Sequence, residues 1–144
     1  DRLWGGGGDD TISGHTGTSA GGTATTIDGA DTLSGGDGDD TLIMGRGDFG
    51  TGGDGADTFW LDAGSNADAP AFATITDYTA GTDRIELHYT PVLSAQGVEV
   101  PPVFSVIMGP ANAYAVVQMN GDPVAHVTGA SSLTLADLIL IKDA

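Results

Sequence analysis

The sequence predicts an all-β protein in which a right-handed parallel β-roll is followed by an antiparallel, β-sandwich-like cap. Three observations predict this fold: a nine-residue glycine–aspartate repeat, a change of composition near residue 62, and period-two alternation of apolar residues beyond it. Residues 1–60 contain 18 of the 24 glycines, whereas the remainder contains most of the valine, isoleucine and proline. We therefore expect two modules, a roll over residues 1–62 and a cap over residues 63–144.

Composition excludes several classes of protein. The 144 residues carry a formal net charge of −16, so the phosphate backbone of a nucleic acid would repel this chain. The absence of cysteine excludes disulfides and thiolate metal sites. No run of about 18 apolar residues is present, so we expect no membrane-spanning segment. The first residues also lack the basic start and apolar stretch of a secretory signal peptide.

The repeat has the form G-G-x-G-x-D-x-U-x, where U is a large apolar residue, and this pattern is associated with calcium binding. Clear copies occupy residues 5–13, 35–43 and 52–60. Weaker copies occupy residues 26–34 and 44–51, the second of which is one residue short and lacks its apolar anchor. Five copies in one 60-residue stretch predict a stacked array.

The spacing of the sixth-position aspartates gives the register of the array. These residues are Asp1, Asp10, Asp31, Asp40, Asp48 and Asp57, with separations of 9, 21, 9, 8 and 9. The separation of 21 corresponds to one repeat plus a 12-residue insertion, which we place at about residues 14–25 in a stretch rich in Gly, Thr and Ser. Since residues 1–4 match the last four positions of a repeat, we expect the array to begin upstream, in a longer protein.

Each repeat should form one glycine-rich turn and one short strand whose single apolar side chain points inward. Two repeats then complete a coil, and coils stack at ~4.8 Å with turns of like parity above one another. One side of the roll should carry Asp10, Asp40 and Asp57, and the other Asp1, Asp31 and Asp48. Carboxylates that close repel one another, and few basic residues are available to offset them. A hard divalent cation between the turns would do so, and calcium, with about six to eight flexible oxygen ligands, suits this geometry.

Main-chain carbonyls would complete such a site, because alternate carbonyls of an extended turn face opposite neighbouring coils. Positions two and four should face one neighbour together with the aspartate; positions one, three and five should face the other. Positions two and four are Gly6, Gly8, Gly36, Gly38, Gly53, Gly55 and, in a weaker copy, Gly29. Positions one, three and five of the middle copy are Gly35, Asp37 and Asp39. We expect two to four calcium ions in all.

With these repeats, residues 1–60 resemble the calcium-binding β-roll of the repeats-in-toxin (RTX) family of secreted bacterial proteins. The resemblance implies metal between stacked turns, with Asp10, Asp40 and Asp57 as the main side-chain ligands. It implies Asp31 and Asp48 as further ligands, on the side where the insertion and the shortened copy depart from the family pattern.

Residues 73–87 are similar to the segment that follows RTX arrays, commonly D-x-I-x-D-F-x-x-G-x-D-x-I-x-L. Ala73 replaces the first aspartate, whereas Asp77, Gly81 and Asp83 fit, so the resemblance adds Asp77 and Asp83 to the candidate metal residues. In serralysin proteases and alginate-epimerase R-modules, antiparallel strands follow and close the roll.

The residues beyond this segment independently predict strands. Residues 120–123 (Asn-Gly-Asp-Pro) predict a hairpin turn, and residues 133–137 predict one helical turn. Strands are expected at 85–89, 103–108, 114–119, 124–128 and 138–141. An acidic residue followed by this last apolar run resembles the uncleaved C-terminal signal of a type I secretion substrate, which implies an extracellular protein and a type I secretion apparatus as partner.

Other short motifs are better explained by the repeat or by loops. The G-x-S-x-G motif at residues 17–21 lacks the strand–turn–helix context of a catalytic serine. The G-x-G-x-x-G motif at residues 45–50 lacks a βαβ unit, and the tripeptide Arg46-Gly47-Asp48, which resembles an integrin-recognition sequence, is accounted for by the repeat.

Histidine and tryptophan give no stronger indication of a catalytic site. His15, His88 and His126 have no metal-ligand spacing, so a zinc hydrolase is not expected. Trp4 and Trp60 occupy the last position of a repeat, which points outward, and could pack on an adjoining module or stack on a sugar.

Three functional hypotheses remain. The first is a calcium-dependent folding and secretion module without catalysis of its own, monomeric and attached to an upstream domain. The second is a carbohydrate-binding accessory module, similar to alginate-epimerase R-modules, with a polysaccharide as partner. The third is the C-terminal tail of a secreted protease or lipase whose catalytic domain lies upstream.

Overall fold

The computed structural model describes residues 2–14, 30–63 and 72–143. Within these ranges the chain is all-β, as predicted, with fourteen strands and two short 3-10 turns. The strands are β1 (Arg2–Gly7), β2 (Thr11–Ser13), β3 (Thr32–Asp37), β4 (Thr41–Met44), β5 (Phe49–Asp54), β6 (Thr58–Asp62), β7 (Ala73–Ile75), β8 (Arg84–Tyr89), β9 (Val92–Leu93), β10 (Glu99–Val100), β11 (Phe104–Met108), β12 (Tyr114–Met119), β13 (Asp122–Thr128) and β14 (Leu138–Lys142). The 3-10 turns are η1 (Pro110–Asn112) and η2 (Leu135–Asp137), the latter within the predicted helical turn.

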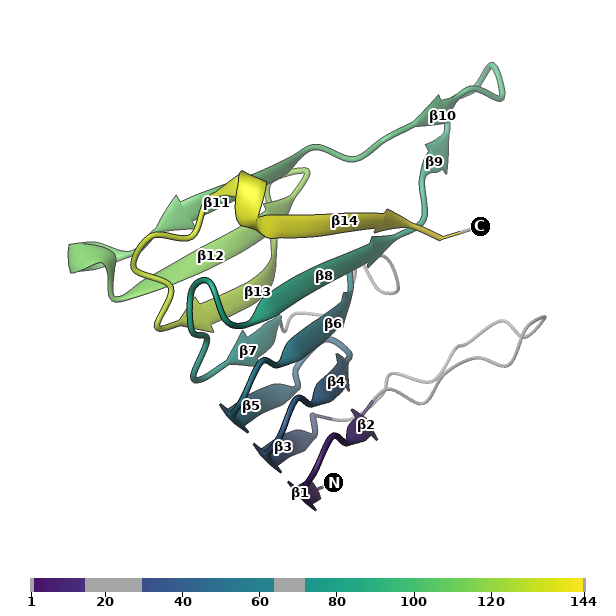
Figure 1. Cartoon of the computed structure of the whole chain (residues 1–144). Coiled ribbons are helices and arrows are strands. Elements are labelled where there is room, and N and C mark those ends of the chain that lie inside the picture. Colours follow the sequence, from purple (N-terminus) through teal and green to yellow (C-terminus); the bar gives the residue numbers. More distant parts are fainter. Residues whose placement is uncertain (1, 15–29, 64–71, 144) are drawn as a thin grey trace.

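The strands form two large sheets. The seven-stranded sheet has the order β1-β3-β5-β7-β13-β12-β11, and the five-stranded sheet has the order β14-β8-β6-β4-β2. In the seven-stranded sheet, the neighbouring strands β1, β3, β5, β7 and β13 pair in parallel. In the five-stranded sheet, all neighbouring strands pair in parallel. A separate antiparallel ribbon, β9–β10, projects from the body of the molecule (Figure 1).

The chain alternates between the two sheets, so each pair of successive strands from β1 to β8 makes one coil of a roll (Figure 1). The pairing is in phase with the nine-residue repeat: Ile12 pairs with Leu42, and Leu42 pairs with Phe59. All three side chains are buried between the sheets. The predicted parallel roll, with turns of like parity stacked, is therefore confirmed.

Strands β1, β3 and β5 are longer than the predicted x-U-x triplet because they continue through the glycine pair. Gly36 lies within β3 and pairs with Gly6 on one side and Gly53 on the other. Its φ is +120°, and a Cβ at this position would overlap the carbonyl oxygen of Gly6. Only glycine therefore permits the coils to stack at this point.

The roll continues past residue 62, where the sequence predicts a change to antiparallel strands. Strands β7 and β8 pair in parallel with β5 and β6, and β13 and β14 then pair in parallel with β7 and β8. Antiparallel pairing in the large sheets is limited to β11, β12 and β13. The module boundary at residues 62 and 63 remains a prediction.

The β12–β13 connection is the predicted hairpin turn. Met119 pairs with Asp122, and the two residues between them, Asn120 and Gly121, both have positive φ. This geometry matches the right-handed twist of the strands and explains the Asn-Gly sequence.

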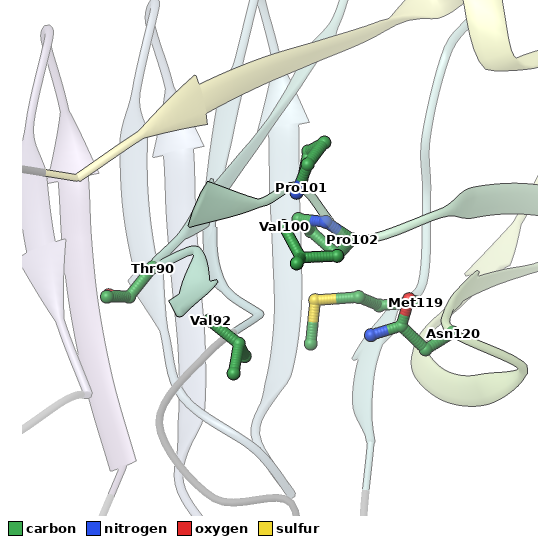
Figure 2. Close-up of a pocket in the computed structure, with 7 residues that line it drawn as sticks. All are labelled: Thr90, Val92, Val100, Pro101, Pro102, Met119 and Asn120. Carbon is green, nitrogen blue, oxygen red and sulfur yellow. The ribbon is translucent and has the colours of Figure 1, made fainter. Parts of the chain in front are cut away.

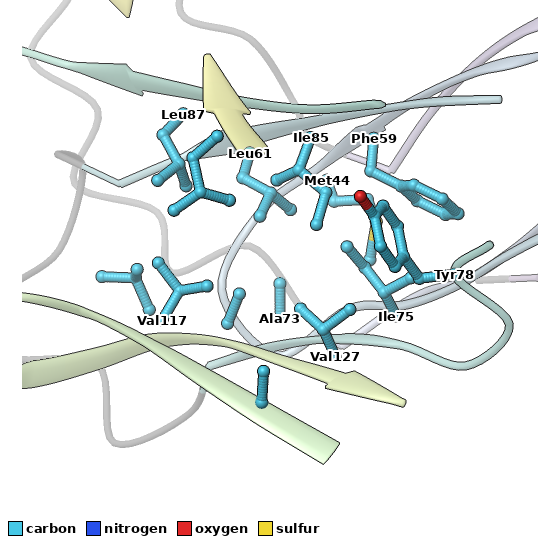
Figure 3. Packing of buried hydrophobic residues seen from close by; sticks show 14 of the residues in the cluster. Met44, Phe59, Leu61, Ala73, Ile75, Tyr78, Ile85, Leu87, Val117 and Val127 are labelled. Carbon is cyan, nitrogen blue, oxygen red and sulfur yellow. The ribbon is translucent and has the colours of Figure 1, made fainter. Parts of the chain in front are cut away.

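A single hydrophobic core runs from the roll into the C-terminal strands (Figure 3). Phe59, Ile85, Val117 and Val127 are fully buried, although they come from β6, β8, β12 and β13. Packing of this kind couples the stability of the roll to that of the antiparallel strands.

Several predicted features lie outside the described residues. Asp1, Gly29, His15, the motif at residues 17–21 and nearly all of the predicted insertion belong to this group. No helix in the described part of the chain has the length and hydropathy needed to cross a bilayer.

Candidate metal centre

Four aspartates stack on one side of the roll, where β1, β3, β5 and β7 turn into the five-stranded sheet. We call Asp10, Asp40, Asp57 and Asp83 the aspartate ladder. The main-chain N–H of each of the first three donates a hydrogen bond to Oδ1 of the next, at 2.8, 3.0 and 3.1 Å. The ladder thus joins four successive coils through carboxylates rather than through sheet pairing alone.

The second carboxylate oxygen has no partner in three of these residues. Oδ2 of Asp10, Asp40 and Asp57 is buried, and no hydrogen-bond donor reaches it. A buried carboxylate oxygen without a donor is energetically costly, and native proteins avoid it unless an ion or another group occupies the site. The same unsatisfied atom recurs in three consecutive turns, which indicates a repeated cation site.

Main-chain carbonyl oxygens of the next coil lie near Oδ2 of Asp10 and of Asp40. A Cβ on Gly35 would overlap both Oδ2 of Asp40 and the carbonyl oxygen of Gly52 in the next coil. Likewise, a Cβ on Gly55 would overlap the carbonyl oxygen of Gly38. Glycine at these positions therefore leaves space in which carboxylate and carbonyl oxygens of neighbouring coils approach one another.

Electrostatics also disfavour a stack of ionised carboxylates that has no positive charge beside it. Burial raises the pKa of Asp57, and the charges of Asp83, Asp40 and Asp77 raise it further. The hydrogen bond from the main chain of Asp40 acts in the opposite direction and only partly offsets this. A positive charge in the stack would favour the ionised form.

Both carboxylate oxygens of Asp83, the last residue of the ladder, accept hydrogen bonds from main-chain donors. Oδ1 of Asp83 accepts from the N–H of Asp57, and its Oδ2 accepts from the N–H of Thr79 at 2.7 Å. Both oxygens of Asp77 accept from the main-chain N–H groups of Gly52 and Gly53, each at 2.9 Å. Asp77 and Asp83 therefore join the final repeat to the coil formed by β7 and β8.

The opposite side of the roll is built differently. Asp31 and Asp48 stack there, and Asp48 accepts from the N–H of Asp31 at 2.9 Å and from the N–H of Gly45 at 2.8 Å. In the next coil the register places Ala73 beside Asp48. Donors thus reach both oxygens of Asp48, and within the described residues 72–89 no further carboxylate continues this stack.

The position-five aspartates form an outer ladder. Oδ1 of Asp9 accepts from the N–H of Asp39 at 3.1 Å, and Oδ1 of Asp39 accepts from the N–H of Ala56 at 2.9 Å. Asp37, at the end of β3, is exposed and pairs with Asp54 of β5. These side chains lie outside the gaps, so their contribution to a metal site would come from main-chain carbonyls.

The remaining motifs do not form a second site. Asp48 is 1% exposed and fully hydrogen bonded, so the tripeptide at residues 46–48 does not present its carboxylate to a receptor. His88 stacks on Trp60 and lies 3.2 Å from Asp143, whereas His126 contacts Tyr114 on the other sheet.

A small hollow of about 110 Å³ lies beside the β9–β10 ribbon, away from the aspartate ladder (Figure 2). Its lining is mainly apolar and contains no charged side chain: Thr90, Val92, Val100, Pro101, Pro102, Met119 and Asn120. It therefore lacks the carboxylates that a calcium site requires.

The oxygen atoms at the ladder are of the kind that calcium prefers as ligands. In the described residues, no group of three or more His, Asp or Glu side chains is arranged to hold a metal, so a cation between the coils would depend on carbonyls as well as on one carboxylate. Oxygen-only, flexible and carbonyl-rich sites suit calcium better than magnesium or zinc. Sequence reasoning omitted Gly52 from the candidate set, although its equivalence to Gly35 in the repeat would have identified it.

Comparisons with known proteins agree with this geometry. The family model described as "Peptidase M10 serralysin C terminal" matches residues 5–100, more than half of the chain. The solution structure of the AlgE6R3 subunit of the Azotobacter vinelandii mannuronan C5-epimerase superposes with a TM-score of 0.59 at 22% identity, covering 96% of this chain and 77% of that one. At that identity the likeness concerns the fold. No curated protein matches the chain.

Proposed function

The chain belongs to the peptidase M10 serralysin C-terminal family, and from this premise we propose that it is a calcium-binding module that folds when calcium binds. It would serve as the folding and secretion tail of a larger, type I-secreted protein. The observation that carries the proposal is the row of three buried, unpartnered Oδ2 atoms on Asp10, Asp40 and Asp57.

Two gaps on the ladder side have the same composition of candidate ligands. Between the first two coils these are Oδ2 of Asp10 with the carbonyls of Gly6, Gly8 and Gly35. Between the next two coils they are Oδ2 of Asp40 with the carbonyls of Gly36, Gly38 and Gly52. Bound calcium supplies the positive charge that these oxygens otherwise lack. A third gap lies between Asp57 and the coil that carries Asp77 and Asp83. One ion in each of these three gaps would agree with the expected two to four ions.

Coupling of folding to calcium follows from the composition of the repeats. Residues 1–60 have 11 acidic and two basic residues, a net charge of −9, and 18 glycines. Ordering the backbone costs ~1–2 kcal/mol per residue, more for glycine, and each repeat buries only one large apolar side chain. The binding free energy of calcium would therefore be folding free energy, as in other small metal-dependent domains.

This coupling would suit secretion. Extracellular modules typically bind calcium at about 10⁻⁴–10⁻³ M, so such a chain would be unfolded inside the cell and folded in the external medium. The proposal includes an extracellular location, a type I apparatus as partner and an upstream domain, and it assigns no reaction to this chain.

Circular dichroism and calorimetry test the proposal. In chelator we expect the spectrum of the whole chain to have a large disordered contribution from residues 1–60. At millimolar calcium we expect a β-spectrum and heat of binding for two to four ions. Magnesium at the same concentration should not replace calcium. A full β-spectrum in chelator that calcium leaves unchanged, together with no heat of binding, would reject the proposal.

A further inference from the structure

The outer face of the seven-stranded sheet is distinct from the rest of the molecule. Its side chains form two rows across the sheet, defined by strand register and alternation with buried neighbours. The first row is Arg2, Thr32, Phe49, Thr74, His126, Val116 and Ile107. The second row contains Trp4, Ser34, Thr51, Thr76, Thr128 and Tyr114. We call these two rows the outer face.

The outer face has no carboxylate. Neither row contains Asp or Glu, although the chain has 20 acidic residues, and its one formal charge is that of Arg2 at the edge. By contrast, the outer side of the five-stranded sheet carries Glu86, which pairs with Trp60, and Asp62, which pairs with His88. A neutral face on a molecule with net charge −16 is a local property rather than a consequence of composition.

Aromatic rings recur across this face and remain open to solvent. Trp4 is 77% exposed and Phe49 is 48% exposed. His126 lies between two further rings, with centroid distances of 4.3 Å to Tyr114 and 6.0 Å to Phe72. Phe49 and His126 lie in the same row on strands two apart in the sheet, a spacing of ~10 Å. Trp4 lies two strands beyond Phe49 but in the second row.

Hydroxyl groups occupy the positions between the rings. Ser34 and Thr51 pair next to Trp4, and Thr74 lies between Phe49 and His126. Thr51 and Thr76 hydrogen-bond to each other at 2.7 Å, which fixes the orientation of both side chains. Over β1, β3, β5 and β7 the face thus alternates aromatic rings with small groups that donate and accept hydrogen bonds.

We propose that the outer face binds a neutral polysaccharide. Sugar rings have apolar C–H faces that pack on aromatic side chains and hydroxyls that exchange hydrogen bonds with Ser and Thr. An anionic polymer would be repelled by the net charge and would find only Arg2 as counter-charge. A protein partner would favour a contiguous apolar centre, whereas over β1, β3, β5 and β7 the rings are separated by hydroxyl residues.

Affinity electrophoresis in native gels tests this proposal, with hydroxyethyl cellulose, laminarin or galactomannan as neutral probes and alginate as the anionic comparison. The protein is run in millimolar calcium, and circular dichroism establishes that it is folded, so a failure of calcium-dependent folding is detected separately. We expect at least one neutral glycan to retard the chain and alginate not to do so.

Substitutions on the two sheets locate the binding. Trp4→Ala and Phe49→Ala remove exposed rings, and each should weaken retardation by about tenfold. Trp60→Ala on the five-stranded sheet should leave it within about twofold, and Ile139→Ala, also on that sheet, serves the same purpose if Trp60→Ala does not fold. The proposal is overturned if no neutral glycan retards the folded chain, if only alginate does, or if the double variant at positions 4 and 49 binds as the parent does. Self-association in analytical ultracentrifugation that these two substitutions abolish, without glycan binding, would instead identify a contact between copies.

Discussion

The main-chain N–H of Asp40 donates to Oδ1 of Asp57 at 3.0 Å, while Oδ1 of Asp40 itself accepts from the N–H of Asp10 at 2.8 Å. These partners are 17 and 30 residues away in the sequence, yet they make equivalent contacts. Asp40 and Asp57 therefore each have two separable roles. Oδ1 holds neighbouring coils in register, and Oδ2 faces a gap without a protein donor.

Asp40→Asn should separate these roles. The amide oxygen can still accept from Asp10, so the register contact is retained, whereas the charge and one gap-facing oxygen are lost. We expect calcium affinity to fall by about tenfold or more, equivalent to ~1.4 kcal/mol. Asp40→Ala removes both roles and should be worse in the same calcium titration.

The control for Asp40→Asn is Asp54→Asn, which removes the same charge from an exposed position at the end of β5. Its calcium titration should match that of the parent chain apart from a small, salt-sensitive change. Equal losses for the two variants would show that net charge, not the position of Asp40, governs binding.

Gly36→Ala should destabilise the roll even when calcium is saturating. The added Cβ would overlap the carbonyl oxygen of Gly6, and the residue would need a φ of +120°. Strain of this kind costs on the order of 1–3 kcal/mol before the steric overlap is added. Urea unfolding in millimolar calcium measures the loss.

Gly7→Ala is the matched control for Gly36→Ala. No heavy atom lies within 4 Å of a Cβ at Gly7, and its φ is not positive. This variant should unfold within about 0.5 kcal/mol of the parent. If both substitutions were equally tolerated, the close stacking of the glycine pairs would be incorrect.

The nine-residue spacing was sufficient to predict the roll and the stacking of Asp10, Asp40 and Asp57, because a period-two strand and a glycine turn leave little choice of register. The same reasoning did not identify β7 and β8 as further strands of the roll. Ala73 occupies the position where the repeats have an aspartate, and the turn at residues 76–83 has no glycine pair. The sequences of β7 and β8 therefore do not match the repeat. Their place in the roll depends on long-range pairing with β5 and β6, which a local pattern does not reveal.

The shortened copy at residues 44–51 shows a second limit of local patterns. It has Gly50 where the other copies have a large apolar residue, which suggests a gap in the core. A Cβ on Gly50 would instead meet Sδ of Met44 at 2.5 Å, so the methionine side chain already occupies that space. Compensation between residues on different strands is visible only once the strands are packed.

Met44→Ala should therefore open a cavity at the weakest repeat. Met44 is fully buried, and truncation of a buried methionine costs about 2–5 kcal/mol. Thermal unfolding in millimolar calcium measures the change. Ile43→Ala, at a half-buried position that faces outward from β4, is the control and should cost less than about 1.5 kcal/mol. A smaller effect at Met44 than at Ile43 would contradict the packing at Gly50.

The turn that leads into β14 provides a pH-dependent contribution. Oδ2 of Asp137 accepts from the main-chain N–H of Thr134 at 2.7 Å and from its hydroxyl at 2.8 Å. The hydroxyl and main-chain hydrogen bonds together lower the pKa of Asp137 below its ordinary value. The carboxylate thereby closes η2 just before β14 pairs with β8.

Because the pKa of Asp137 is lower in the folded state, the unfolded state binds more protons in the acid range. Its stabilising contribution is therefore complete above the ordinary aspartate pKa of about 3.9 and is lost as the pH falls through the lowered value. Asp137→Asn should reduce the melting temperature at pH 7, and the difference from the parent should shrink as the pH falls below about 4. Both chains keep the same metal residues, so any pH dependence of calcium binding cancels in that difference at saturating calcium. Asp122→Asn, an exposed change of the same charge at the start of β13, leaves the Asp137–Thr134 contacts in place and is the control for the loss of charge itself. A difference between Asp137→Asn and the parent that is constant down to pH 3 would mean that the carboxylate of Asp137 does not cap this turn.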